Sequence, residues 1–154
     1  MSGTQTPPPP PPALRRLDRL AGTCTMAGNP AGSDDNNITG QTTFRWLPGG
    51  LFPEQRARID FAGQQIDALE LIGYDPQTDT FPPTVFSGFS PAPLPYRWDA
   101  QGDNVTITVA CAPPDATFTG SWRQDGTFPG SRRPNPGANQ TVNIPHDISG
   151  HRLQ

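Results

Sequence analysis

Two ionisable side chains lie on otherwise apolar faces of the predicted segments. In an enclosed site such side chains could act as a general acid or base. In an alternating segment, Glu70 shares a side with four largely apolar residues: Ile66, Ala68, Ile72 and Tyr74. His146 shares a side with Val142, Ile144 and Ile148. Burial shifts the pKa of an isolated carboxyl or imidazole, and a group that titrates near neutrality can exchange protons with a substrate. Glu70 and His146 are therefore the candidate catalytic residues.

Each of the two has an alternative placement. Leu69 and Leu71 are apolar as well, so their face of the segment could point inward and leave Glu70 in solvent. His146 follows Pro145 and could lie on a rim. If both side chains point inward and meet, each favours the charged form of the other, which raises the pKa of the histidine and lowers that of the glutamate.

The segments that carry these residues predict an all-β fold. Runs of β-branched and aromatic residues alternate with turn residues at near-regular spacing. The predicted strands begin at residue 22 and continue at 38–47, 51–61, 64–74, 80–88, 96–99, 104–110, 116–123, 127–132 and 141–149. These nine or ten strands have no crossover helix between them, and closure would remove exposed sheet edges. We predict an antiparallel up-and-down β-barrel.

The chain before the first strand divides into two parts. Residues 1–12 end in six consecutive prolines, which cannot donate to a sheet, so a disordered leader is expected there. Leu14, Leu17 and Leu20 are spaced by three, which indicates a short helix or 3₁₀ turn. The barrel domain is expected to occupy residues 13–154.

Composition excludes several classes of function. The net charge is −3, and the eleven basic residues, all arginine, are scattered, so no nucleic-acid partner is expected. No apolar run approaches the roughly 20 residues of a membrane helix, so no membrane partner is expected either, and the predicted location is cytoplasmic. In that reducing compartment Cys24 and Cys111 should be free thiols. No cluster of histidine and cysteine suggests a metal site.

The apolar strand faces carry large aromatic side chains that could line a cavity. The candidate ligand-binding residues are Phe44, Trp46, Phe61, Tyr74, Phe118 and Trp122. The alternative is that they only fill the core, as aromatic residues usually do.

Three motifs in order resemble a known group of barrels. "LDRLAGTCTMAG", residues 17–28, resembles the start of small lipocalin-like (calycin) barrels, in which a short helix plugs one end and the first strand opens with Gly-x-Trp. "FRWLPGG" (44–50) and "IGYDPQT" (72–78) are similar to an uncharacterised bacterial lipocalin-like family. Cys24 stands where the tryptophan usually is, which implies a looser barrel base. Gly22, Thr23 and Gly28 also resemble the opening of the nitrobindins, which ligate haem iron through a histidine near the C-terminus.

The sequence thus predicts binding of a small hydrophobic ligand in the barrel lumen. One alternative is a small barrel enzyme, of cyclase or isomerase type, from a bacterial natural-product pathway, with Glu70 or His146 as the acid or base. A second alternative, implied by the resemblance, is a haem-binding protein with iron on His146 or His151; otherwise no cofactor is expected. The expected partner is a small apolar molecule, and a homodimer is an open alternative to a monomer.

Overall fold

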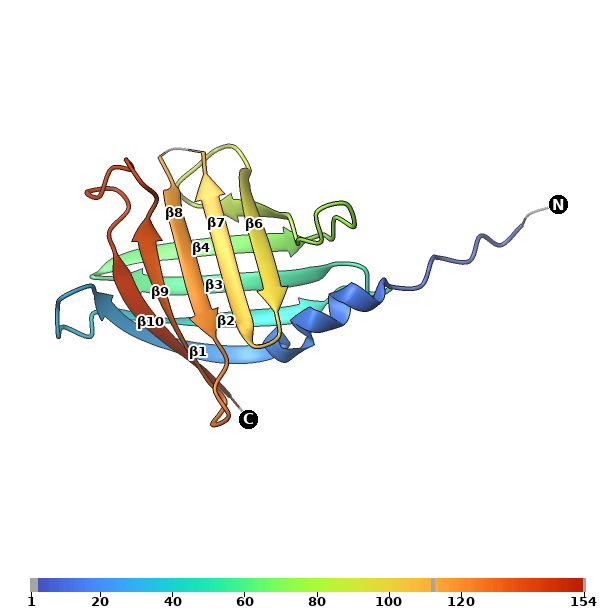
Figure 1. Ribbon diagram of the computed structural model, residues 1–154, viewed down its shortest axis with the longest axis horizontal. Helices are drawn as coiled ribbons and strands as arrows, with labels where there is room; N and C mark the ends of the chain where they lie inside the picture. Colours follow the sequence, from blue (N-terminus) through green and yellow to red (C-terminus); the bar gives the residue numbers. More distant parts are fainter. Residues whose placement is uncertain (1–2, 112, 154) are drawn as a thin grey trace.

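The chain folds into a closed antiparallel β-barrel (Figure 1). A computed structural model describes residues 3–111 and 113–153. Within these residues each strand pairs with its neighbours in sequence, and β1 pairs with β10 to close the barrel. The ten strands are β1 Gly22–Pro30, β2 Ile38–Trp46, β3 Pro53–Phe61, β4 Gln64–Ile72, β5 Pro83–Ser87, β6 Leu94–Gln101, β7 Asn104–Ala110, β8 Asp115–Ser121, β9 Thr127–Pro134 and β10 His146–Arg152. The predicted up-and-down barrel is confirmed.

A short helix precedes the barrel. η1 is a 3₁₀ helix, Pro12–Leu20, and its Leu14 and Leu17 are buried. A 3₁₀ helix has three residues per turn, so side chains three apart lie on one line, which explains the three-residue leucine spacing. Residues 3–11 carry no helix or strand and project away from the barrel (Figure 1); disorder of the leader stays a prediction. No helix in the described part of the chain is long and apolar enough to cross a membrane.

η1 covers one end of the barrel, which we call the closed end. Its leucines belong to a cluster of fully buried residues contributed by the helix, four strands and the β4–β5 connection. The cluster comprises Leu14, Leu17, Phe44, Ile72, Phe81, Trp98, Ala100 and Val105. This packing makes the closed end the main hydrophobic core of the molecule.

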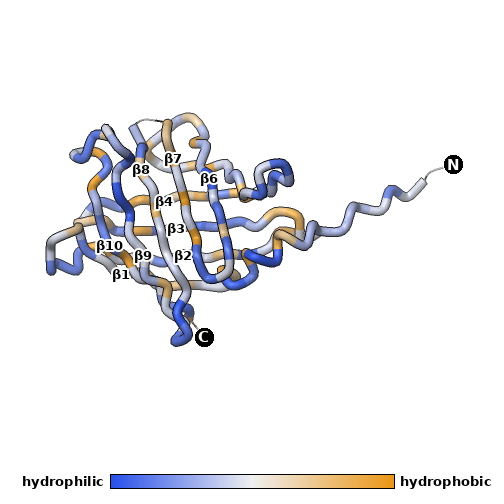
Figure 2. The backbone as a smooth tube through the Cα atoms, viewed as in Figure 1, coloured by the Kyte–Doolittle hydropathy of each residue, from blue (hydrophilic) through white to orange (hydrophobic). Residues whose placement is uncertain are grey.

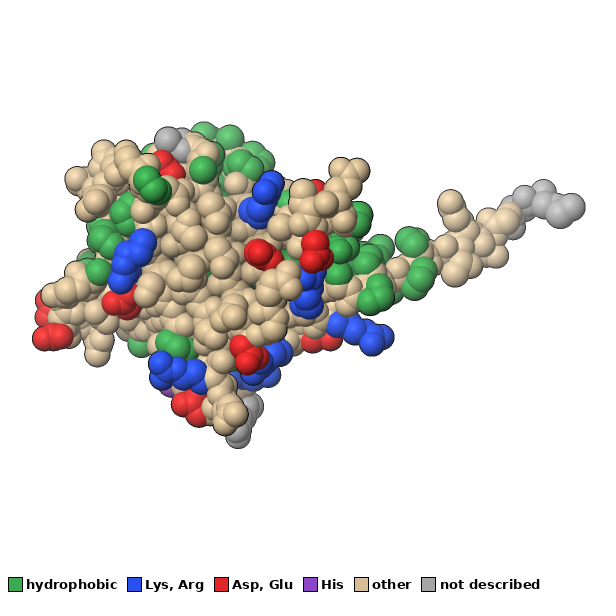
Figure 3. All heavy atoms as spheres, viewed as in Figure 1, with side chains coloured by type: hydrophobic (Ala, Val, Ile, Leu, Met, Phe, Trp, Pro, Cys, Tyr) green, Lys and Arg blue, Asp and Glu red, His purple; other side chains and the backbone are tan. Residues whose placement is uncertain are grey.

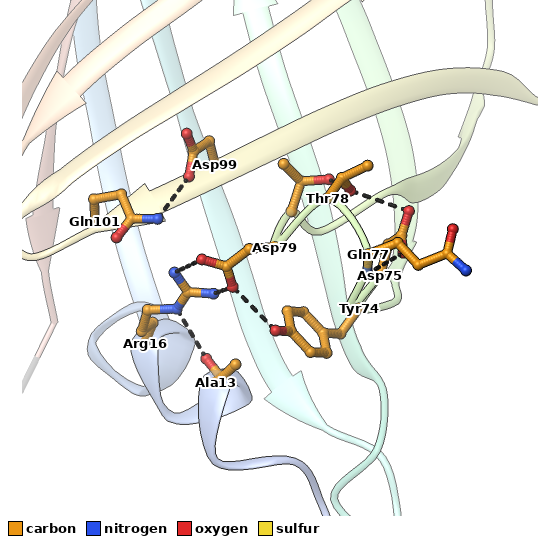
Figure 4. A network of polar contacts seen from close by, with 10 residues as sticks. Ala13, Arg16, Tyr74, Asp75, Gln77, Thr78, Asp79, Asp99 and Gln101 are labelled. Carbon is orange, nitrogen blue, oxygen red and sulfur yellow. Dashed lines mark hydrogen bonds and ion pairs between the residues drawn. The ribbon is translucent and has the colours of Figure 1, made fainter.

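Residues 73–82, here called the strap, connect β4 to β5 across the closed end. The backbone N–H of Phe81 donates to the Trp98 carbonyl oxygen at 2.7 Å, and the N–H of Trp98 donates back to Phe81 at 2.9 Å. Arg16 of η1 pairs with Asp79 of the strap, and the Tyr74 hydroxyl donates to the same carboxylate at 3.0 Å (Figure 4). The strap therefore ties η1 to β6. The sequence had placed residues 73–74 and 80–82 in strands, which is wrong.

The opposite end, which we call the mouth, is formed by the connections at 31–37, 62–63, 88–93 and 135–145. Phe89, Val142 and Ile144 are exposed on these connections. β10 begins at His146 rather than at residue 141, so the expectation that Val142 and Ile144 share a strand face with His146 is wrong. The mouth instead carries these apolar side chains on loops.

The distribution of hydrophobic and charged residues is that of a barrel wall with an inner and an outer face. Hydrophobic and hydrophilic residues alternate along the strands, as expected for a wall with one face inside and one outside (Figure 2). Acidic and basic side chains are interspersed on the face shown in Figure 3, with no continuous band of either sign.

Candidate functional site

Glu70 faces the lumen of the barrel. β4 is apolar on both faces, and the pairing register decides which face is inside. Glu70 lies opposite Gln55 on β3 and opposite Val85 on β5, and Val85 is buried. Leu71, on the other face, is 36% exposed. The inward orientation of Glu70 is confirmed, and the alternative with Leu69 and Leu71 inside is wrong.

The carboxyl of Glu70 is enclosed by protein and has one hydrogen-bond donor among the described residues. The Trp98 indole Nε1–H donates to its Oε2 at 3.1 Å. Burial raises the pKa of Glu70 from 4.5 to about 7, although the Trp98 hydrogen bond and the positive charge of Arg132 act in the opposite direction. Glu70 therefore changes its protonation state near neutral pH.

The facing wall of the barrel presents a row of larger side chains at one level. The register of β6 to β10 aligns them directly across from one another, strand by strand: Trp98, Ile107, Phe118, Arg132 and His146. In this row the Phe118 ring lies against Gly130, where any Cβ would collide with it. The glycine therefore makes room for an aromatic ring that lies flat on the wall.

Arg132 brings a permanent positive charge into the lumen. It comes from β9, and its guanidinium carbon lies 6.0 Å from the centre of the Tyr96 ring on β6. Strands β7 and β8 separate β9 from β6 in the wall, so the side chain reaches across the interior. Among the described residues, the Arg132 guanidinium forms neither an ion pair nor a hydrogen bond.

His146 also faces inward, at the mouth. It lies opposite Arg132 on β9 and Pro30 on β1, and its ring packs edge-on against Phe61 with ring centres 5.1 Å apart. The Nδ1 atom is 2.9 Å from the Ile144 carbonyl oxygen. A proton on Nδ1 makes this hydrogen bond and leaves the Nε2 lone pair available.

The coupling expected if Glu70 and His146 meet does not arise. No hydrogen bond or ion pair joins them among the described residues, and the pKa of His146 is lowered rather than raised. Burial is the main cause, and the charges of Arg132 and Arg133 add to it, while the Ile144 carbonyl and Asp147 oppose it. Since burial disfavours the charged form of each group, it raises the pKa of the acid and lowers that of the base.

Small side chains on β1 to β5 line the inner face at the level of these polar groups. We call this set the inner belt: its members pair directly across the strands and are all half-buried. The inner belt consists of Cys24, Thr42, Ala57, Ala68 and Ser87. At the closed end, in contrast, Leu17, Ile72 and Phe81 are completely buried. Large side chains therefore fill the closed end, whereas the middle of the barrel is lined on these strands by small, half-buried ones.

The six aromatic candidates from the sequence lie in different parts of the barrel. Phe61 and Phe118 face the lumen near His146 and Arg132. Phe44 and Trp46 pack in or against the core of the closed end, and Tyr74 lies on the strap, where it contacts Phe81. The sixth, Trp122, follows β8 and stacks on Phe128, with the guanidinium groups of Arg19 and Arg152 over its ring.

Three residues that face the lumen, Tyr96, Trp98 and Arg132, were not predicted as site residues from the sequence. Tyr96 and Trp98 share one side of β6, and Arg132 shares a side of β9 with Phe128. This alternation was visible in the sequence and could have placed all three inside. The charge of Arg132 hid the signal, because an arginine on a strand is usually taken as exposed.

Other reactive groups lie apart from this set. Cys24 and Cys111 are free thiols, as expected, and burial raises the pKa of the Cys24 thiol. No group of three or more metal-ligating side chains occurs in the described residues. Of the two histidines, His151 is exposed and His146 faces the lumen. Haem iron, if the protein takes it up, would therefore be held by Nε2 of His146.

The comparisons with known proteins identify a family. No curated protein matches the chain. A family model described as "Protein of unknown function (DUF1579)" matches residues 10–131. The matched segment includes η1, Glu70 and Trp98, and it ends one residue before Arg132. Because the match covers more than half of the chain, the protein belongs to the DUF1579 family.

Proposed function

We propose that this protein is a lipocalin-like barrel of the calycin type that binds a small, largely hydrophobic molecule in its lumen. The inner belt is the observation that carries the proposal. It places five small, half-buried side chains at one level of the wall, between a filled closed end and a solvent-accessible mouth. Barrels of this size hold one small ligand in such a space.

The mouth supports entry of an apolar molecule. Phe89, Val142 and Ile144 are exposed there, and Phe61 lies just inside, against the ring of His146. Exposed apolar side chains around an opening commonly mark a route for ligands. The same arrangement gives a ligand apolar contacts from the mouth to the middle of the barrel.

Filling the inner belt should weaken binding. We expect Ala68→Phe to weaken binding of N-phenyl-1-naphthylamine at least about tenfold, which corresponds to ~1.4 kcal/mol, because the new ring takes the space of the ligand. This dye is uncharged and fluoresces in apolar surroundings, so titration of wild type and variant measures the effect directly.

Ala27→Phe is the matched control, since Ala27 is exposed on the outer side of β1. It should leave dye binding unchanged. Equal dye affinity in the wild type and Ala68→Phe, with both proteins folded by circular dichroism, would contradict a site in the lumen.

A small barrel enzyme is the second candidate function. The observation that favours it is Glu70, which titrates at about 7 in an enclosed site and is oriented by Trp98. A carboxyl with such a pKa can both accept and return a proton at neutral pH. The test is conversion of whatever compound co-purifies with the protein: mass spectrometry should show turnover by wild type and none by Glu70→Gln.

Haem binding rests on the orientation of His146 described above. A visible absorption band in protein purified from haem-supplied cells, and its loss in His146→Ala but not in His151→Ala, is the result expected of a haem protein. A colourless protein under those conditions would contradict this alternative.

A further inference from the structure

Arg132 is a half-buried charge on the inner face of the barrel, without a counter-ion among the described residues. The two arginines of β9 differ in this respect. Arg133, on the outer face, pairs with Asp147 at 2.8 Å and also donates to the His146 carbonyl oxygen at 2.9 Å. Arg132, on the inner face, has no such partner among the described residues, and its guanidinium lies against the Tyr96 ring. Charges that are partly withdrawn from water are normally paired, so this guanidinium lacks a partner that a ligand can supply.

The other ionisable groups of the lumen do not neutralise Arg132 fully. Glu70 on β4 is close enough for the arginine to lower its pKa, yet the carboxyl is hydrogen-bonded to Trp98 instead. Glu70 is also partly protonated at neutral pH, so it supplies less than one negative charge. The Cys24 thiol, whose pKa burial raises, adds no negative charge there. The lumen consequently has a net positive character beside an apolar space.

We propose, on the basis of the lumen-binding function above, that the ligand is a small organic acid whose carboxylate pairs with the guanidinium of Arg132. The planar fork of a guanidinium matches the two oxygens of a carboxylate and can bind both of them. The apolar part of the ligand then lies over the inner belt, with Phe118 and Phe61 on the other side. The anion takes the place of the missing counter-ion.

Three probes of equal chain length test the charge preference. Decanoate, 1-decanol and decylammonium carry the same alkyl body with a negative, a neutral and a positive head. We expect displacement of N-phenyl-1-naphthylamine to give decanoate at least about a tenfold lower Kd than 1-decanol, with decylammonium the weakest. Equal affinities for the three, or tighter binding of decylammonium, would overturn the proposal while leaving a lumen site intact.

Substitution of Arg132 locates the preference. Arg132→Met keeps an unbranched apolar stem and removes the charge. It should raise the Kd of decanoate about tenfold and leave that of 1-decanol unchanged. Arg132→Lys keeps the charge without the fork and should retain part of the preference. Arg58→Met is the matched control, since that arginine is 75% exposed on the outer face and pairs with Asp67.

The possible failures are distinguishable. Loss of the decanoate preference in Arg58→Met as well, or its persistence in Arg132→Met, would show that Arg132 does not bind the carboxylate. Failure of the dye and all three decyl probes to bind wild-type protein would contradict the proposed lumen binding itself, and with it this inference.

Discussion

At pH 8 the Glu70→Gln variant is expected to be more stable than the wild type by up to about 3 kcal/mol. The folded protein holds the pKa of Glu70 at about 7, mainly through burial, whereas its ordinary value is 4.5. Between these two values the unfolded chain releases a proton that the folded chain keeps, so wild-type stability falls as the pH rises. Above pH 7 the buried Glu70 carboxyl is ionised, and its burial destabilises the folded wild type. Glutamine has no charge, so the variant avoids this loss of stability.

The measurement is urea unfolding of wild type and variant from pH 4 to pH 8. The stability difference should be close to zero near pH 4, where the carboxyl is protonated in both states, and should grow through the interval from 4.5 to 7. A difference that does not change with pH would mean that Glu70 has an ordinary pKa and is not enclosed.

Glu54 is a control for which the effect of the Glu→Gln substitution on stability has the opposite sign. Its side chain is 6% exposed on the outer face, and Arg45 and Arg56 donate hydrogen bonds to its two oxygens. These hydrogen bonds are the main reason that the pKa of Glu54 is lowered. Its contribution to stability is therefore present above the unfolded pKa and is lost as the pH falls through the folded one. Glu54→Gln should destabilise at neutral pH, and the difference should shrink in acid.

Glu54 and Glu70 differ in whether a positive charge compensates their carboxylates. Glu54 has two arginine partners, and its charge supports the fold. Glu70 has a neutral indole as its donor, and Arg132, whose charge lowers its pKa, does not form an ion pair with it. Residues that violate the usual rules of burial in this way are typical of binding and catalytic sites. That contrast supports a functional role for the Glu70 and Arg132 region.

Much of the fold was predictable because it depends on local patterns. Alternation of side chains fixes strand character, and turn residues fix most strand limits, so the barrel could be predicted from sequence. The three-residue spacing of Leu14, Leu17 and Leu20 predicted the short helix for the same reason. The last strand was misplaced because Val142 and Ile144 mimic strand alternation, although the structure places both on an exposed loop.

The candidate site was less predictable because it depends on register and enclosure. In β4 both faces are apolar, and only pairing with Gln55 and Val85 shows that Glu70 is inside. The pKa directions of Glu70 and His146 depend on how much protein surrounds each group, which no spacing reveals. Arg132 has inward alternation in the sequence, but its lack of a partner emerges only in three dimensions.

Replacing Phe81 by alanine is expected to reduce the free energy of unfolding by about 3–5 kcal/mol. Phe81 is completely buried where the strap crosses the closed end, between Tyr74 and the guanidinium of Arg16. Its removal leaves a cavity that the backbone cannot close, because the strap is fixed to Trp98 by hydrogen bonds in both directions. Urea unfolding at pH 7 measures the loss, which is large against the roughly 5–15 kcal/mol that stabilises a typical domain.

Phe86→Ala is the matched control, since this ring is 45% exposed on the outer face of β5. It should cost less than about 1 kcal/mol, because little apolar area returns to water. Similar losses in the two variants would mean that the strap does not seal the barrel and that the closed end is not its main core. A much larger loss at Phe81 means that η1, the strap and β6 form one packed unit, which holds Trp98 in place to donate to Glu70.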